Sequence, residues 1–368
     1  MSPVDPSVAS SIAPTSTNHS PATAEPIHVA CCVDDRYIMG LAVTLQSAAT
    51  HLSLGRRLVV DLVDGGVSEA NRARLDEAMS NVGVELHWRA LESSRLQSLP
   101  ISHHISTTAY FRVLLGELLA ERDRVLYLDC DLLIRGDLSE LWETSLDGVS
   151  CAAAADVGCP YFDSLKTLKN VRRAGPYLSV FRPIRNYRQL GFDGHEPYFN
   201  SGVLLIDLEA WRRERIAERT IECLERNRRH VWCWDQYGLN IVLSGQWRRL
   251  PVRWNVGAHL YEYPNEAALP LPIEECKEAI RDPALVHFTT NRKPWSPGAE
   301  HPYLDQFFET LDETPWRGWR PGSPPATLHQ WLVDRVTLWR RGATISGRHA
   351  LLASLPPRTN TLTQLRAQ

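Results

Sequence analysis

Short apolar segments alternate with segments of helical length from Ile27 onwards, and this alternation restricts the fold more than any other feature of the 368-residue chain. Repeated β-α-β units with a largely parallel sheet are encoded in this way. Helices are predicted between the strands, one with Ser68 as its N-cap and another over residues 208–228. The sequence therefore predicts one α/β domain. The segments predicted as strands are 27–33, 58–63, 84–88, 125–128, 151–155, 203–207 and 284–288.

The two ends of the chain differ in composition from this domain, which is predicted to span residues 27–320. Residues 1–26 are rich in Pro, Ser, Thr and Ala and lack the apolar core of a signal peptide, which predicts a disordered tail. Residues 321–368 contain many arginines, and their apolar residues recur on one helical face. That pattern is typical of a basic amphipathic segment that binds an anionic membrane surface.

A basic segment interrupts the α/β pattern between residues 158 and 197. It is rich in Gly and Pro, and it has few acids to balance its basic residues. We interpret it as an insertion that acts as a lid, and the alternative is a solvated surface loop. Its basic residues are Lys166, Lys169, Arg172, Arg173, Arg182, Arg185 and Arg188.

Charge and cysteine content exclude several classes of protein. The formal net charge of -3 argues against a protein whose main role is to bind a nucleic-acid backbone. The eight cysteines show no C-x-x-C spacing, so buried thiols in a reducing compartment are favoured over disulfides or a zinc site. No stretch approaches the roughly 20 apolar residues of a membrane span. The expected location is the cytoplasm, with peripheral attachment to the inner face of the cytoplasmic membrane.

Two carboxylates follow the apolar segment that begins at Val125. Asp129 and Asp131 are two residues apart, so at strand spacing both side chains point to the same side. Ligands bind α/β sheets at the carboxyl ends of parallel strands, and paired carboxylates suit Mg²⁺ or Mn²⁺ on a diphosphate. Taken alone, however, the pair favours a solvated turn after a strand, because Asp-x-Asp is common by chance.

A second candidate for metal binding lies far away in the sequence. His287 ends the predicted strand 284–288, and Lys293 follows it beside a Pro-Trp pair. An imidazole ligand suits Mn²⁺ better than Mg²⁺, and a lysine can neutralise phosphate. A single histidine at a strand end is more often a core residue with satisfied hydrogen bonds. The presence of Asp129 and Asp131 supports metal binding by His287, and the presence of His287 supports metal binding by the two acids.

Six segments in this order resemble motifs of glycosyltransferase family 8, which includes glycogenin and bacterial lipopolysaccharide galactosyl- and glucosyltransferases. The resemblance extends from about residue 27 to residue 319 and is closest to the lipopolysaccharide α-galactosyltransferases. It implies a single GT-A type nucleotide-diphospho-sugar transferase domain with a mixed, mostly parallel central sheet. The segments are Asp34–Tyr37, Ile105–Arg112, Val125–Asp131, Tyr198–Leu205, Trp234–Gln236 and His287–Trp295.

The resemblance implies roles for individual residues. Asp34 and Tyr37 would hold uracil, and Arg36 would lie near the ribose. Arg112 would reach the donor sugar or its phosphate, and Lys293 would neutralise the diphosphate. The metal ligands would be Asp129, Asp131 and His287, and the residues around the donor sugar would be Asp156, Asn200, Asp235 and Gln236.

Several of these residues also have purely structural interpretations. Tyr37 and Arg112 fit packing and surface charge, and Asn200 fits a turn before a strand. Asp235 and Gln236 fit the start of a helix. Thr290 departs from the family pattern, which usually has glycine there so that the backbone can approach phosphate closely.

The resemblance implies a retaining transfer of galactose or glucose from a UDP-sugar, with Mn²⁺ or Mg²⁺, to a saccharide or lipid-linked acceptor. Retaining hydrolases use a carboxylate nucleophile, whereas the residue expected beneath the anomeric carbon is Gln236, whose amide is a poor nucleophile. A front-face reaction is therefore favoured, in which the departing UDP oxygen helps to deprotonate the acceptor. A C4 epimer changes only one hydroxyl, so the sequence separates galactose from glucose weakly.

Two other classes of protein remain as alternatives. A sugar nucleotidyltransferase would carry a Gly-rich basic loop after its first strand, where this chain has Asp34-Asp-Arg-Tyr37. A non-catalytic protein that binds UDP-sugars would not need the acids, the histidine and the lysine that are all present here.

Overall fold

The computed structural model describes residues 25–91, 96, 99 and 107–322. The predicted tails at 1–26 and 321–368 therefore lie outside the described residues, except for the two positions of each that adjoin the domain. The strands are β1 (Ile27–Val33), β2 (Leu58–Asp64), β3 (Glu85–Arg89), β4 (Arg124–Leu128), β5 (Leu132–Ile134), β6 (Cys151–Ala155), β7 (Phe199–Asp207), β8 (Trp247–Leu250), β9 (Val256–Gly257) and β10 (Leu285–His287).

Helices connect most of these strands. The α-helices are α1 (Ile38–Thr50), α2 (Glu69–Asn81), α3 (Leu115–Leu118), α4 (Leu138–Trp142), α5 (Ser164–Thr167), α6 (Val171–Ala174), α7 (Leu208–Arg213), α8 (Ile216–Arg226), α9 (Trp234–Val242), α10 (Ile273–Arg281) and α11 (Leu304–Leu311). The 3₁₀ helices are η2 (Thr107–Leu114), η3 (Gly175–Tyr177), η4 (Val252–Trp254), η5 (Ala258–Glu262) and η6 (Glu266–Ala268).

The central sheet has seven strands in the order β3-β2-β1-β4-β7-β6-β8. Every neighbouring pair is parallel except the two that include β7, which is antiparallel to both β4 and β6. The prediction of a mixed, mostly parallel sheet is confirmed. Because β7 runs in reverse, its amino end lies at the edge where the parallel strands have their carboxyl ends.

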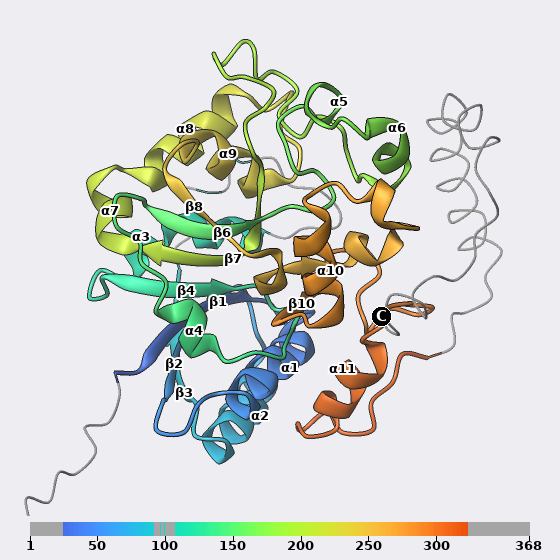
Figure 1. Cartoon of the computed structure of the whole chain (residues 1–368). Helices are drawn as coiled ribbons and strands as arrows, with labels where there is room; N and C mark the ends of the chain where they lie inside the picture. The colour runs from blue at the N-terminus through green and yellow to red at the C-terminus, as the bar shows by residue number, and fades with distance from the viewer. Residues whose placement is uncertain (1–24, 92–95, 97–98, 100–106, 323–368) are drawn as a thin grey trace, which may run out of the picture.

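Apolar residues on the two faces of this sheet belong to two separate cores. Alternate residues of β1 point to opposite faces, so Val29 and Cys31 join a core with α1 and α2, whereas Ala30 joins a core with α8 and α9. Figure 1 shows these two pairs of helices on opposite sides of the sheet. The sheet is thus buried on both faces, as the continuous apolar strands predict.

A second sheet of three short strands, in the order β5-β10-β9, lies at the carboxyl end of β4. Strand β10 pairs antiparallel with β5, so that His287 faces Leu132, and parallel with β9, so that His287 also faces Gly257. This sheet joins three segments that are far apart in the sequence. It fixes the position of His287 relative to the end of β4.

The structure corrects parts of the predicted secondary structure. The predicted strand at 284–288 is present as β10 but belongs to the small sheet, and β8 takes the edge of the large sheet. The predicted helix over 208–228 is two helices, because Arg215 between α7 and α8 has a φ of 54°. Ser68 does precede α2, but its side chain makes no capping bond and its hydroxyl donates to Asp35 instead.

The basic segment 158–197 connects β6 to β7 and contains α5, α6 and η3. Asp163 is buried and accepts from Arg182 and from the hydroxyl of Tyr187, so one carboxylate joins distant parts of the segment. Asn170 donates to two carbonyl groups near η6, and Figure 1 shows α6 close to the orange part of the chain. The segment is thus anchored to the domain at several points.

Within the described residues, no helix combines the length and the apolar character needed to cross a bilayer. All eight cysteines are free thiols, and six of them are buried. The burial of these six agrees with the interpretation of most of the cysteines as core residues.

Candidate active site

Asp129 and Asp131 lie between the end of β4 and the start of β5. The side-chain oxygens of both face Nε2 of His287, at 3.7 Å from Asp129 Oδ2 and 3.2 Å from Asp131 Oδ1. One ligand atom from each of the three residues lies within 4.8 Å of the others. The register of the small sheet causes this convergence, because His287 pairs with Leu132, the residue after Asp131.

Gly202 on β7 leaves the space in which these ligands meet. A Cβ atom at this position would lie 2.3 Å from Cε1 of His287 and 2.6 Å from Oδ2 of Asp129. Such distances are far shorter than van der Waals contact, so any side chain would displace two of the three candidate ligands. The carbonyl of Gly202 also accepts from the backbone N–H of Asp129 at 2.8 Å, which holds the two strands together here.

Lys293 brings a positive charge to the same cluster. Its Nζ donates to Oδ2 of Asp131 and, at 2.8 Å, to the carbonyl of Phe288. Burial alone would raise the pKa of Asp131, but Lys293 and His287 hold it well below its usual range. Burial would lower the pKa of Lys293, but Asp131 raises it. Both groups are therefore charged at neutral pH.

Arg112 lies beneath the carboxylates and is almost fully buried, with 6% of its surface exposed. It forms ion pairs with Asp129 at 3.1 Å and Asp235 at 3.0 Å, and its guanidinium stacks over the ring of Tyr127. Burial opposes its charge, but Asp129 and Asp235 hold its pKa well above the usual range. The structure thus places Arg112 under the site as the counter-charge of two acids.

Asp235 is the acid whose environment raises its pKa most clearly. Burial raises the pKa to about 6, although Arg112 acts against this effect and Asp129 adds to it. Ser201 on β7 donates its hydroxyl towards Asp235 at 3.4 Å. Asp235 and the adjacent Gln236 lie in the first turn of α9, directly after two residues with positive φ, Cys233 and Trp234.

Asp156, Asn200 and Gln236 form a second polar cluster. Asp156 follows β6, and its Oδ2 accepts from Nδ2 of Asn200 at 3.1 Å and Nε2 of Gln236 at 3.0 Å. The other end of the Gln236 amide accepts from the backbone N–H of Ser201 at 3.0 Å. Both ends of the 158–197 segment therefore lie at this cluster, as Asp156 precedes it and Asn200 follows it.

A change of register gives β7 the extra residues of this cluster. Ala153 pairs with Leu204, but Ala155 pairs with Phe199, so β7 is longer than β6 between these pairs. The extra residues include Asn200 and Gly202. Bulges of this kind redirect side chains near active sites.

Asp34, Arg36 and Tyr37 follow β1 at the same edge of the sheet. Arg36 donates to Asp34 at 3.0 Å. Tyr37 packs edge-on against Trp295 with ring centroids 5.5 Å apart. Burial raises the pKa of Tyr37; Lys293 acts against this effect and Asp131 adds to it, which is consistent with a position beside the acid cluster.

Sequence reasoning missed three residues that connect the predicted ones. Tyr127 donates to Asp129 at 2.7 Å, Ser201 connects Arg112 with Gln236, and Asn255 connects Asn200 with His287. The position of Tyr127 two residues before Asp129, on the same side of the strand, could have indicated its role. Ser201 and Asn255 carry no such signal, because their partners are distant in the sequence.

The donor set fits a divalent cation. Two carboxylates and one imidazole are the mixed oxygen and nitrogen ligands that suit Mn²⁺, whereas Mg²⁺ prefers oxygen alone. Oδ1 of Asn255 lies 2.9 Å from Nδ1 of His287, which leaves Nε2 directed towards the acids. The structure brings these three residues together, and their role as metal ligands stays a prediction.

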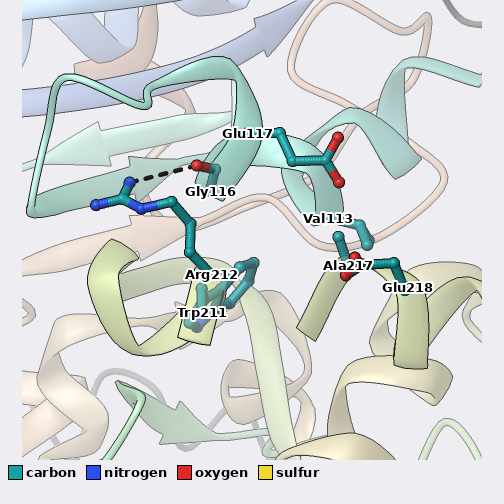
Figure 2. A pocket seen from close by; sticks show the side chains of 7 residues that line it. All are labelled: Val113, Gly116, Glu117, Trp211, Arg212, Ala217 and Glu218. Carbon is teal, nitrogen blue, oxygen red and sulfur yellow. Dashed lines mark hydrogen bonds between the residues drawn. The ribbon is translucent and has the colours of Figure 1, made fainter. Parts of the chain in front are cut away.

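A separate small cavity of about 130 Å³ lies between η2, α3, α7 and α8. Figure 2 shows Arg212 at its wall, donating to the carbonyl of Gly116. None of its lining residues belongs to the acid and histidine clusters. Arg212 donates to the carbonyls of Gly116 in α3 and of Leu119 and Arg122 after α3, so its side chain connects α7 to the carboxyl end of α3.

The fold and the site together define a class of protein. A mostly parallel sheet with one reversed strand, and an acid-histidine cluster at the carboxyl ends of its strands, constitute a GT-A type domain. The model of glycosyl transferase family 8 matches residues 28–298, and the chain belongs to this family. The resemblance found in the six motifs is thereby confirmed.

Relatives with assigned names align with most of the chain. General stress protein A of Bacillus subtilis (strain 168) is 29% identical over 79% of this chain and 95% of its own. Lipopolysaccharide 1,2-glucosyltransferase of Escherichia coli (strain K12) is 28% identical over 80% of each. Lipopolysaccharide 1,3-galactosyltransferase of Salmonella typhimurium (strain LT2) is 25% identical over 80% of each.

Solved structures support the same fold. The galactosyltransferase LgtC, crystallised with donor and acceptor sugar analogues, superposes with a TM-score of 0.62. It is 26% identical in sequence, and the match covers 78% of this chain and 96% of that one. The expected GT-A fold is therefore confirmed, and the chain is a glycosyltransferase.

Proposed function

We propose that this glycosyltransferase transfers a hexose, galactose or glucose, from a UDP-sugar to a saccharide or lipid-linked acceptor, with retention of the α configuration. The observation that carries the proposal is the convergence of Asp129, Asp131, His287 and Lys293 at one point. A cation site beside a lysine suits a diphosphate leaving group. Relatives named as lipopolysaccharide glucosyl- and galactosyltransferases favour a hexose as the transferred group.

In this proposal the metal would be held by Asp129, Asp131 and His287, and it would supply charge that stabilises the diphosphate. Lys293 would neutralise the same group as a point charge. Asp34 and Tyr37 would bind uracil, and Arg36 would lie near the ribose. Arg112, which is buried beneath the acids, would act on the diphosphate or sugar through Asp129 and Asp235.

The sugar would lie against the cluster of Asp156, Asn200, Asp235 and Gln236. Both ends of the Gln236 amide are engaged, by Ser201 and Asp156, and Asp235 is paired with Arg112. These contacts favour orienting roles over nucleophilic attack. The bond from the anomeric carbon to the UDP oxygen would break as the bond to the acceptor oxygen forms on the same face. The acceptor proton would pass to the departing phosphate.

Segment 158–197 and the carboxyl-terminal tail are the two parts of the chain that we expect to meet the acceptor. We propose that the segment closes over the donor, excludes water and contributes to the acceptor site.

The tail at 321–368 would hold the enzyme on the inner face of an anionic membrane that carries the acceptor. Deleting residues 321–368 should reduce co-sedimentation with anionic liposomes while UDP binding is retained. Equal sedimentation of both proteins would contradict this anchor.

A panel of nucleotide sugars tests the donor. Purified protein with Mn²⁺ should slowly hydrolyse UDP-galactose or UDP-glucose in preference to other nucleotide sugars, measured as release of UDP. EDTA should stop the reaction, and Asp131→Asn should abolish it. Undiminished turnover in EDTA would refute the proposed metal site. Hydrolysis of a different nucleotide sugar would refute only the assignment of UDP-galactose or UDP-glucose as the donor.

A further inference from the structure

Asn255 lies between η4 and β9. Its side chain contacts His287, one of the candidate metal ligands, on one side and Asn200 of the second polar cluster on the other. It is buried, with 2% of its surface exposed. Its Oδ1 is 2.9 Å from Nδ1 of His287, and its Nδ2 is 2.9 Å from Oδ1 of Asn200. Its backbone N–H donates to the carbonyl of Val252 at 2.9 Å, which holds the backbone here against η4.

Groups of known polarity determine the direction of each hydrogen bond in this chain. The backbone N–H of Gly202 can only donate, and it lies 2.9 Å from the Asn200 side chain, so the facing atom is the oxygen Oδ1. Nδ2 of Asn200 then donates to Asp156, whose carboxylate can only accept when it is ionised. The amide of Asn200 is thus oriented from both ends.

The orientation of Asn200 determines the orientation of Asn255. Because Oδ1 of Asn200 accepts, the group that faces it from Asn255 must be the donor Nδ2. Oδ1 of Asn255 then faces His287, so Nδ1 of the imidazole must carry a hydrogen. The other ring nitrogen, Nε2, lies 3.2 Å from Asp131 Oδ1, at the point where a cation would bind.

We propose that Asn255 is the positioning residue of the metal site: it holds His287 with Nδ1 protonated and Nε2 available to the metal. This inference rests on the proposed function. Ligand histidines in metalloproteins are oriented by a partner on their second nitrogen, and loss of that partner weakens metal binding. Here the partner is an amide that also binds Asn200, so the orientation of the metal ligand depends on the cluster that faces the sugar.

Two substitutions separate the bonds of Asn255. Asn255→Ala removes both and leaves a buried N–H of His287 without a partner. Asn255→Asp keeps an acceptor for His287 but cannot donate to Asn200. Asn255→Asp should therefore retain most of the metal affinity that Asn255→Ala loses, while both variants should weaken donor binding.

Titration with Mn²⁺ alone, followed by the electron paramagnetic resonance of free Mn²⁺, tests the inference without any sugar. Asn255→Ala should raise the Kd for Mn²⁺ by roughly 10- to 100-fold. Asn186→Ala is the matched control, since Asn186 is a buried asparagine that binds Asn227 and Tyr237 away from the site. Its Kd should equal that of the wild type, and Asp131→Asn should show no binding.

An unchanged Kd for Asn255→Ala, or an equal loss in Asn186→Ala, would overturn the inference and leave the proposed function intact. A wild-type protein that transfers sugar but binds no Mn²⁺ would overturn both the inference and the proposed metal. If Asn255→Ala does not fold, nuclear magnetic resonance of the ¹⁵N-histidine wild type with Mg²⁺ decides. The His287 signals, identified by their loss in His287→Gln, should show hydrogen on Nδ1, and hydrogen on Nε2 would refute the inference.

Discussion

At the scale of single residues, the site depends on the absence of one side chain. Gly202 lies so close to His287 and Asp129 that a single added carbon would meet both. Its φ is not positive, so the need for glycine here comes from space and not from backbone conformation. A glycine within a buried strand often marks such a close approach.

Gly202→Ala should therefore abolish Mn²⁺ binding and transfer while the fold is retained. Gly257→Ala is the matched control, because Gly257 also pairs with His287 in the small sheet, yet its Cβ would meet nothing closer than 3.4 Å. Calorimetric titration with Mn²⁺ measures the effect. Wild-type affinity in Gly202→Ala would show that the ligands can move apart at little cost.

The raised pKa of Asp235 predicts that the free energy of unfolding depends on pH. Its pKa is about 6 in the folded protein and about 3.9 when unfolded, so the unfolded chain loses this proton first as the pH rises. The contribution is fully present below pH 4 and is lost as the pH rises through 6. The loss is about 3 kcal/mol, at 1.36 kcal/mol per unit of pKa.

Asp235→Asn removes this titration. Between pH 4 and pH 7 the wild type should lose up to about 3 kcal/mol of its free energy of unfolding through this titration, and Asp235→Asn should not show this loss. Urea unfolding at both pH values measures the difference. A constant difference between the two proteins at pH 4 and pH 7 would show that the pKa of Asp235 is not raised.

At the scale of elements, segment 158–197 carries basic residues of two kinds. Arg182 pairs with the buried Asp163 inside the segment, and Arg185 stacks over Trp232 outside it, so both arginines already have structural partners. Arg172 and Arg173 lie on α6, are exposed and form no ion pair with any described residue. The second pair is thus better placed to meet an acidic acceptor.

Neutralising Arg172 and Arg173 together should raise the KM for a phosphorylated or acidic acceptor and leave the KM for UDP-sugar unchanged. Guanidinium groups bind such oxygens in pairs, which a neutral glutamine cannot reproduce. Arg182→Gln is expected instead to lower the thermal stability, because it leaves Asp163 with a weaker partner. If the acceptor KM of the double variant stayed at the wild-type value, the segment would be a surface loop without a role in acceptor binding.

Sequence patterns predicted the strands of the central sheet because apolar runs at strand length are explicit in the residues from Ile27 to Val33 and from Val125 to Leu128. They did not predict β8, whose sequence Trp247-Arg-Arg-Leu250 has only one buried residue. Residue type and strand position singled out Asp129, Asp131 and His287, and the family resemblance joined them into one predicted set of metal ligands. Asn255 was not, because its role arises from contacts with residues 55 and 32 positions away.

At the scale of the whole molecule, bound metal should stabilise the fold. A ligand at 100 times its Kd that binds only the folded state contributes about 2.7 kcal/mol. Mn²⁺ should therefore raise the Tm of the wild type, and EDTA should reverse the effect. The variant Asp131→Asn should show no shift, and an equal shift in this variant would place the stabilising ion elsewhere.

The small sheet has a consequence for the order of folding. Asp131 and His287 are brought together only when β5 pairs with β10, although β5 spans residues 132–134 and β10 spans residues 285–287. Contacts of such high sequence separation require closure of a long loop and form slowly. During synthesis the ribosome must release β10 before the last ligand can reach the other two. A nascent chain that ends before residue 285 would therefore contain all seven strands of the central sheet but no complete cation site, so activity would arise only once synthesis is nearly finished.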